Sequence, residues 1–200
     1  MNWDDSNLDK LPDKIGEALE GACGKPQSPL RTPAFASTNQ FETAVRTVVL
    51  RRAERAERRL TCFADVRSTK IRELKLNSQA QWLFYHPVQR VQIRATAQAF
   101  VYNENQIARE FWERMPLKQR VGYCATESPG SPLAEPGDAI PAALRSDRAR
   151  ESELETGYQN FAVIVTEVDQ FEWLRIGDEG HRRAVLRWSG EKYSGFWLVP

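Results

Sequence analysis

The sequence predicts a mainly β protein, an antiparallel barrel of Greek-key type with a few helices packed on it. Short runs rich in β-branched and aromatic residues recur along the chain, and turn residues separate them. Few segments have helical spacing, so the regular alternation of strand and helix that builds a parallel sheet is absent from the pattern. The length suits one compact core, and we expect a single domain over residues 1–200.

The elements are expected in the following order. An amphipathic helix spans 8–22, a second helix spans 68–76 with Ser68 as its N-cap, and a third spans 105–115 and ends before Pro116. Strands are expected over 35–38, 43–50, 60–64, 81–86, 91–102, 161–168, 171–176, 184–188 and 195–199. Two segments are expected to be irregular: the charged connection 51–59, and a long proline- and glycine-rich loop at about 128–150.

The composition excludes several classes of protein. Charged residues make up 28% of the chain and leave a net charge of only +1, so the total charge does not predict a nucleic-acid partner. The cysteines Cys23, Cys62 and Cys124 are odd in number and widely spaced, which favours reduced thiols. The N-terminus lacks a signal-peptide pattern and no apolar run reaches the length of a membrane span. We therefore expect a cytoplasmic, soluble protein.

Two short segments concentrate cations and hydroxyls. Arg46–Arg51 lies on an expected strand, and Asp65–Lys70 lies where the next strand turns into a helix. Unsatisfied backbone N–H groups and the helix dipole favour an anion at a helix start, where Ser68, Thr69 and Lys70 would add donors and charge. The residues alone leave two interpretations open: a phosphate monoester site, or an ordinary N-cap beside surface cations.

A larger pattern connects these segments with two others. The chain contains Arg46-Thr47-Val48-Val49-Leu50-Arg51, then Ser68-Thr69-Lys70, then Gln92-Ile93-Arg94, and finally Phe111-Trp112 shortly before Pro116. In order and spacing, this pattern resembles the pyridoxamine 5'-phosphate oxidase-like FMN-binding split-barrel family over roughly residues 30–120. The resemblance implies an FMN-binding split barrel that forms a homodimer with FMN at the interface.

The resemblance also implies roles for individual residues. Arg46, Ser68, Thr69 and Lys70 would hold the FMN phosphate. The backbone at Val48 and Val49 would follow the edge of the flavin ring, Gln92 would reach the flavin from the partner subunit, and Arg183 would lie near the ring. Arg51 and Arg67 complete the implied set of cofactor-binding residues. No residue is implied as an obligatory catalytic acid or base.

The chain also departs from the oxidase of this family. Phe111 replaces a tyrosine and Met115 an arginine that help to bind the substrate phosphate, and the C-terminal Arg-Leu-His-Asp-Arg motif is missing. The expected function is therefore a flavin-dependent oxidoreductase acting on an unidentified small molecule. The alternatives are a non-catalytic flavin carrier or sensor, a split barrel that binds haem or a deazaflavin, and a structural barrel with an empty site.

The histidines and one aromatic cluster offer weaker candidate sites. With His86 and His181 as the only histidines, neither a histidine-rich metal centre nor a histidine triad is expected. Trp82, Phe84 and Tyr85 could form a stacking platform for single-stranded nucleic acid, but such residues in a strand more often pack in a core.

Overall fold

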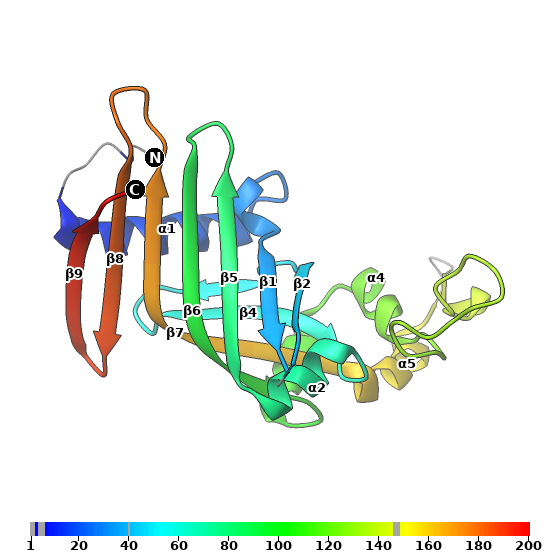
Figure 1. Ribbon diagram of the computed structural model, residues 1–200. Helices are drawn as coiled ribbons and strands as arrows, with labels where there is room; N and C mark the ends of the chain where they lie inside the picture. Colours follow the sequence, from blue (N-terminus) through cyan, green and yellow to red (C-terminus); the bar gives the residue numbers. More distant parts are fainter. Residues whose placement is uncertain (1–2, 4–6, 40, 146–148) are drawn as a thin grey trace.

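The computed structural model describes residues 3, 7–39, 41–145 and 149–200, and its main feature is one nine-stranded antiparallel sheet (Figure 1). The strand order is β2-β1-β5-β6-β7-β4-β3, and β8 and β9 branch from β7. The strands are β1 (Ala34–Thr38), β2 (Thr43–Thr47), β3 (Arg52–Glu54), β4 (Arg59–Asp65), β5 (Gln79–His86), β6 (Val91–Tyr102), β7 (Phe161–Arg175), β8 (Arg182–Ser189) and β9 (Lys192–Leu198). The mainly β class with helices is confirmed. The sheet is not closed, so the expected barrel is an open one.

The long strand β7 joins the two parts of the sheet. Its first half pairs with β4 and its second half pairs with β8, while β6 runs beside both halves. The register between β6 and β7 shifts between Thr96 and Ala97, and such a bulge bends the strands. The prediction of two strands over 161–168 and 171–176 was wrong, because Asp169 and Gln170 lie within one continuous strand at this bend.

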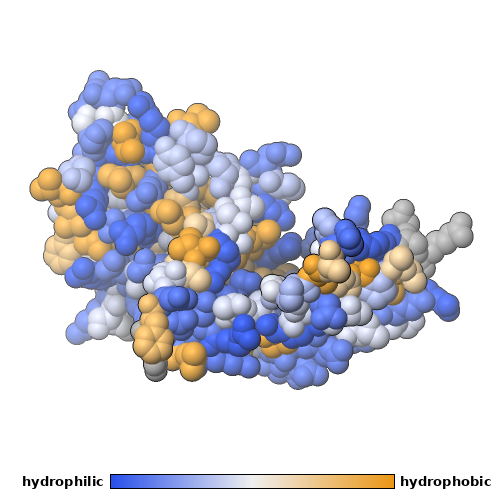
Figure 2. All heavy atoms as spheres, turned by 45° about the vertical axis from the view of Figure 1, so that its right-hand side comes forward, coloured by the Kyte–Doolittle hydropathy of each residue, from blue (hydrophilic) through white to orange (hydrophobic). Residues whose placement is uncertain are grey.

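Few helices accompany the sheet. They are α1 (Leu11–Cys23), α2 (Thr69–Leu76), α3 (Gln106–Arg114), α4 (Leu117–Arg120) and α5 (Glu151–Leu154), with short 3-10 turns between them. The helix α1 passes behind the strands (Figure 1), and its apolar positions Leu11, Ile15 and Leu19 are buried. The segment that contains α4 and α5 projects away from the strands, and Figure 2 shows the molecule hollowed between the two.

The core lies between α1 and the inner face of the sheet. Trp82, Phe84 and Trp173 are fully buried there, and Phe35 packs edge-on against Trp82 with ring centroids 4.9 Å apart. A second cluster forms around Trp112, the second residue of the Phe111-Trp112 pair, which is fully buried. Because Trp82 and Phe84 are core residues, the alternative of a stacking platform for nucleic acid is wrong.

The outer face of the sheet carries several exposed apolar side chains. Strand pairing places Leu83 opposite Arg94, Arg94 opposite Glu172, Glu172 opposite Val185, and Val185 opposite Phe196, so these residues form one row across five strands. Residues directly opposite each other share a face of a sheet. Exposed hydrophobic residues on this face are Val45, Leu83, Tyr85, Phe196 and Leu198.

Some local predictions need correction. The strand expected over 43–50 ends at Thr47. The connection expected over 51–59 contains the strand β3, which pairs with β4, and the turn between these two strands. Charged residues can form this ladder because its hydrogen bonds come from the backbone. The loop at about 128–150 is irregular apart from one short turn where it is described, and its residues 146–148 lie outside the described part.

The cysteines agree with the prediction of free thiols, since Cys23, Cys62 and Cys124 form no disulfide. Burial raises the pKa of the Cys62 thiol to about 12. In the described part of the chain, no helix is long and apolar enough to cross a membrane.

Candidate functional site

The chain crosses between the two parts of the sheet directly after β2. The N–H of Val48 donates to the Pro33 carbonyl oxygen at 3.0 Å, whereas the N–H of Arg51 donates to the Thr61 carbonyl oxygen of β4 at 2.8 Å. Residues 48–51 are therefore not a regular strand, so Arg46 lies on β2 but Arg51 lies beyond its end, although both were expected on one strand. This crossing carries Arg51 to β4, next to the start of α2.

Arg46 is held by residues of β1 and α2. Its guanidinium donates to Ser37 Oγ at 2.5 Å and to Glu73 Oε2 at 2.9 Å, and the Ser37 hydroxyl donates to the same carboxylate oxygen at 2.6 Å. Ser37 and Glu73 are buried, whereas Arg46 is partly exposed. Arg46 therefore neutralises a buried carboxylate and docks α2 onto β1 and β2.

This arrangement predicts that Arg46→Ala destabilises the fold. The substitution leaves the Glu73 carboxylate buried without a cation, which costs about 3 kcal/mol in comparable cases. Thermal and urea unfolding should show this loss, and the double variant Arg46→Ala with Glu73→Gln should recover a large part of it because the buried charge is gone. Equal stability of the single variant and the wild type would contradict the prediction.

The residues at the start of α2 do not share one role. Ser68 is the N-cap position, as predicted, but its hydroxyl donates to the Asp65 carbonyl oxygen at 2.6 Å rather than accepting from the helix. Arg67 forms a two-point ion pair with Asp65 and also donates to the Ala125 carbonyl oxygen at 3.0 Å. Thr69 is exposed, and its hydroxyl accepts from Arg72.

Lys70 and Arg51 are different, because neither forms an ion pair with a carboxylate in the described part of the chain. The nearest partner of Lys70 Nζ is Ser68 Oγ at 3.5 Å, and Arg51 donates to the amide oxygen of Gln119 at 2.8 Å. Burial lowers the pKa of the Lys70 amine and of the Arg51 guanidinium. Both cations act electrostatically on the buried Cys62 thiol, so both lie near the same part of β4.

Lys70 lines a pocket of about 540 Å³. One wall comes from the end of β4 and the start of α2, and the other comes from residues 119–139, which include Gly122, Tyr123 and Ser128. Arg51 lies behind this lining, since it contacts Gln119 and its guanidinium carbon is 5.2 Å from the centroid of the Phe63 ring. A partly buried cation without a counter-charge, at the start of a helix, is suited to an anionic group such as a phosphate.

The charges of the pocket support the same conclusion. Its acidic residues are Asp65, Glu127 and Asp138. Asp65 is paired with Arg67, Asp138 is paired with Arg145, and Glu127 acts electrostatically on Arg67. Each acid of the pocket thus interacts with an arginine, and none of them forms an ion pair with Lys70 in the described part of the chain.

The sequence pointed to Lys70 as a candidate residue, and the structure places Lys70 in a pocket whose second wall was not predicted. Residues 119–127 carry no motif used in the prediction, and the loop at about 128–150 was expected only to be irregular. Its high content of proline and glycine was the one signal that could have pointed to the pocket.

Gln92 and Arg183 lie elsewhere, on the outer face of the sheet. Gln92 is opposite Leu174, and Leu174 is opposite Arg183, so the two polar residues flank one position of β7. Arg183 pairs with Glu172 at 3.1 Å, but its Nε is buried without a hydrogen-bond partner among the described residues. The roles of Gln92, Arg183, Val48 and Val49 toward a flavin stay predictions.

The remaining candidate residues have structural contacts. Trp112 is fully buried and its indole N–H donates to Glu155 at 2.9 Å, and Phe111 packs edge-on against Phe63. His86 accepts from the Gln89 N–H within a turn. Among the described residues, no cluster of His, Cys, Asp or Glu could hold a metal ion.

The open antiparallel sheet with its few helices has the architecture of a split barrel, and the pocket lined by Lys70 lies beside α2. In a comparison with known families, residues 14–103 match the family described as pyridoxamine 5'-phosphate oxidase, FMN-binding domain. Over this range the chain is similar to that FMN-binding domain family, which confirms the resemblance drawn from the four motifs.

Solved structures have the same fold over nearly the whole chain. A pyridoxamine 5'-phosphate oxidase-related, FMN-binding protein from Nostoc punctiforme is 19% identical with a TM-score of 0.74, covering 94% of this chain and 96% of that one. PhzG from Burkholderia lata, solved in complex with tetrahydrophenazine-1-carboxylic acid, is 18% identical with a TM-score of 0.73, covering 98% and 95%. At these identities the match establishes the fold.

Proposed function

We propose that the protein is an FMN-dependent oxidoreductase that binds the flavin phosphate at Lys70 and works as a homodimer. The observation that carries this proposal is the position of Lys70, which is partly buried, lines a pocket and forms no ion pair in the described part of the chain. A bound phosphate would supply the missing counter-charge. The family match over residues 14–103 supports FMN as the phosphate-bearing ligand.

The residues of the pocket fit such a group in two ways. Burial disfavours the charged form of Lys70, so an anion that pairs with it removes a cost already present in the fold. Arg51 lies behind Phe63 and Gln119, where it adds positive potential without closing the pocket. The backbone N–H groups at the start of α2 provide further donors.

When bound, FMN supplies hydride and electron transfer, and the chain supplies binding and orientation. Lys70 and the start of α2 would anchor the phosphate end, which fixes the ligand against the wall formed by residues 119–139. The partly buried Arg183 has one N–H that lacks a partner among the described residues, and supplied from the outer face of a second copy it would place positive charge near the ring and favour its reduced, anionic form.

The positions of the implied residues support the proposed homodimer. Gln92 and Arg183 lie on the outer face of the sheet, whereas Lys70 lies beside α2. A second copy seated on this outer face would cover Leu83 and Phe196 and would bring its own Gln92 toward the ligand. Association by an apolar sheet face is a common mode for homodimers.

The dimer can be tested with one substitution on this face. Leu83 is 40% exposed, and Leu83→Asp should convert the protein to a monomer and lower its FMN content, because the carboxylate would be buried in the interface. Light scattering after size-exclusion chromatography measures the mass. The matched control is Val88→Asp in the β5–β6 turn, a residue 86% exposed, which should stay dimeric. A monomeric wild-type protein would refute the dimer.

The cofactor and the activity need separate measurements. The visible spectrum of the purified protein, followed by denaturation and mass analysis of the released compound, should give one FMN per chain. Reduction of the bound flavin by a nicotinamide cofactor, or by an amine under air, would then support the oxidoreductase. A colourless protein that does not take up added FMN would end the flavin proposal.

A further inference from the structure

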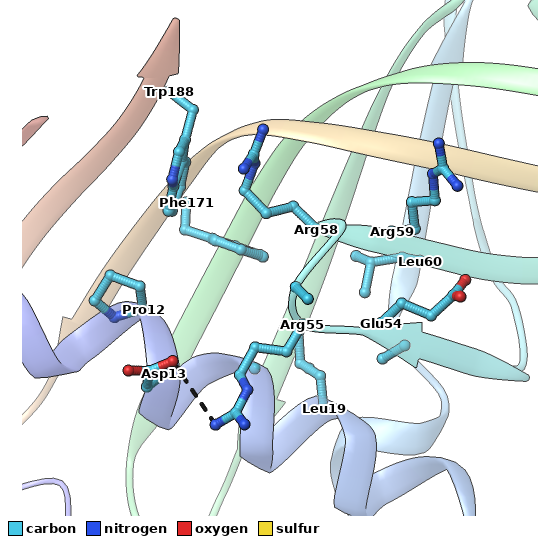
Figure 3. A pocket seen from close by; sticks show the side chains of 13 residues that line it. Pro12, Asp13, Leu19, Glu54, Arg55, Arg58, Arg59, Leu60, Phe171 and Trp188 are labelled. Atoms are coloured by element: carbon cyan, nitrogen blue, oxygen red, sulfur yellow. Dashed lines mark ion pairs between the residues drawn. The ribbon is translucent and has the colours of Figure 1, made fainter. Parts of the chain in front are cut away.

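A second cavity, of about 340 Å³, lies between α1, the β3–β4 turn and the strands β7 and β8 (Figure 3). It shares no lining residue with the pocket at Lys70. Its volume falls within the lower part of the range of roughly 300–1,000 Å³ that small-molecule sites occupy. The proposed flavin site therefore does not explain it.

The cavity has an apolar interior. Leu19 of α1, Leu60 of β4 and Phe171 of β7 line it, and Trp188 of β8 closes one end. Phe171 and Trp188 meet edge to face, with ring centroids 5.9 Å apart. In Figure 3 the Phe171 ring lies between Arg58 on one side and Pro12 with Arg55 on the other. This arrangement favours a flat, aromatic body.

The opening of the cavity is charged, and most of these charges are paired. Arg55 pairs with Glu17 at 3.0 Å and lies 3.7 Å from Asp13. Arg59 pairs with Glu167 at 2.7 Å, and Glu54 pairs with Arg52 at 2.7 Å. These contacts neutralise the two acids of the lining and two of its three arginines.

Arg58 is the arginine of the lining that forms no ion pair in the described part of the chain. Its guanidinium donates to the carbonyl oxygens of Val168 and Gly190, both at 3.3 Å, and lies 5.3 Å from the centroid of the Trp188 ring. These are long bonds to neutral acceptors, so the cation keeps the capacity for a stronger one to a carboxylate. Arg58 also has φ +53°, a conformation that costs energy for a residue other than glycine.

The wall opposite Arg58 depends on a glycine. A Cβ at Gly16 would lie only 2.4 Å from Cγ of Arg55. The Arg55 side chain therefore packs directly on the backbone of α1 at Gly16, a position that a larger residue would block. The backbone N–H of Arg55 donates to the Glu20 carboxylate at 2.8 Å, and the Arg55 guanidinium donates to the Glu17 carboxylate at 3.0 Å. The β3–β4 turn is thus attached to α1 on one side of the cavity, while Arg58 remains available on the other side.

We propose that this cavity is a second binding site, which takes a small aromatic carboxylate. The ring of the ligand lies on the apolar floor beside Phe171 and Trp188, and its carboxylate pairs with the guanidinium of Arg58. The proposal is independent of the flavin site, because it uses none of that site's residues.

The test uses calorimetric titration of the purified protein with two compounds of nearly equal shape, naphthoate and the neutral naphthalenemethanol. Wild-type protein should bind naphthoate about tenfold more tightly, the ratio that roughly 1.4 kcal/mol from one charge-assisted contact gives. In Arg58→Gln this preference should disappear while the affinity for the alcohol is unchanged. In Trp188→Leu, which removes part of the aromatic wall, both compounds should bind more weakly.

The chain offers a matched control for Arg58. Arg90 is also an arginine with a positive φ, +50°, in a hairpin turn, but it lies outside the cavity and pairs with Asp178. Arg90→Gln should bind both compounds as the wild type does. The proposal is overturned if wild-type protein binds neither compound, if Arg58→Gln keeps the full affinity for naphthoate, or if Lys70→Gln abolishes naphthoate binding, which would place the compound in the flavin pocket.

Discussion

Lys70→Ala is expected to lower the affinity for FMN by about 10- to 100-fold, the effect of roughly 1.5–3 kcal/mol that a hydrogen bond to a charged group contributes. The reason is the position of Lys70 in the pocket beside α2, where it forms no ion pair in the described part of the chain. Titration of the flavin-free protein with FMN, followed by the quenching of flavin fluorescence, measures the change directly.

The same substitution should not destabilise the flavin-free protein. Burial lowers the pKa of Lys70, which means that the folded state disfavours the charged amine. Removing the amine removes this cost, so the unfolding midpoint without FMN should stay constant or rise. A lysine with a purely structural role would give the opposite result, a lower midpoint with unchanged FMN affinity.

Lys75 provides the matched control on the same helix. It is an exposed lysine in the last turn of α2 and does not line the pocket. Lys75→Ala should therefore keep the wild-type affinity for FMN. Equal losses of affinity in Lys70→Ala and Lys75→Ala would indicate a general effect of net charge instead of a contact with the phosphate.

The sequence predicted the elements whose pattern is local. Strand β6 runs from Val91 to Tyr102, as the alternation of apolar and polar residues indicated, and Ser68 takes the N-cap position of α2. It could not predict that β7 continues through Asp169 and Gln170, because polar residues at a bend resemble the end of a strand. The prediction also missed β3, because its charged residues lack the apolar pattern of a strand although its backbone pairs with β4.

The candidate site shows the same limit. Lys70 could be proposed from the sequence because a cation in the first turn of a helix is a local feature. Arg46 was expected to contact a phosphate, but its charge is directed to Glu73, a residue 27 positions away whose burial depends on the tertiary fold. The wall formed by residues 119–139 has no periodicity, so only folding shows that it faces Lys70.

The wall of the pocket depends on one buried arginine. Arg120 is only 3% exposed, and it donates to the carbonyl oxygens of Met115 and Glu113, both at 3.0 Å, and to Glu151 at 2.7 Å. Its guanidinium also lies 5.4 Å from the centroid of the Trp112 ring. These contacts attach the segment that begins with α4 to α3 and α5, and the same segment carries Gln119, Gly122 and Tyr123 into the pocket.

Arg120→Ala is expected to lower the free energy of unfolding by about 2–4 kcal/mol, because it removes three hydrogen bonds and the packing of a buried side chain. Lysine should not restore the loss, since one ammonium cannot reproduce the planar arrangement of the guanidinium donors. Urea unfolding measures the energy, and hydrogen exchange should show faster opening of residues 117–139 than of β6.

Glu151→Gln separates the buried contacts of Arg120 from its ion pair. The Glu151 side chain is 67% exposed, so its charge is well solvated and its loss should cost less than about 1 kcal/mol. If Glu151→Gln is as destabilising as Arg120→Ala, the ion pair dominates and the carbonyl contacts contribute little. If only Arg120→Ala destabilises the protein and also weakens FMN binding, the buried arginine links the stability of this segment to the shape of the flavin pocket.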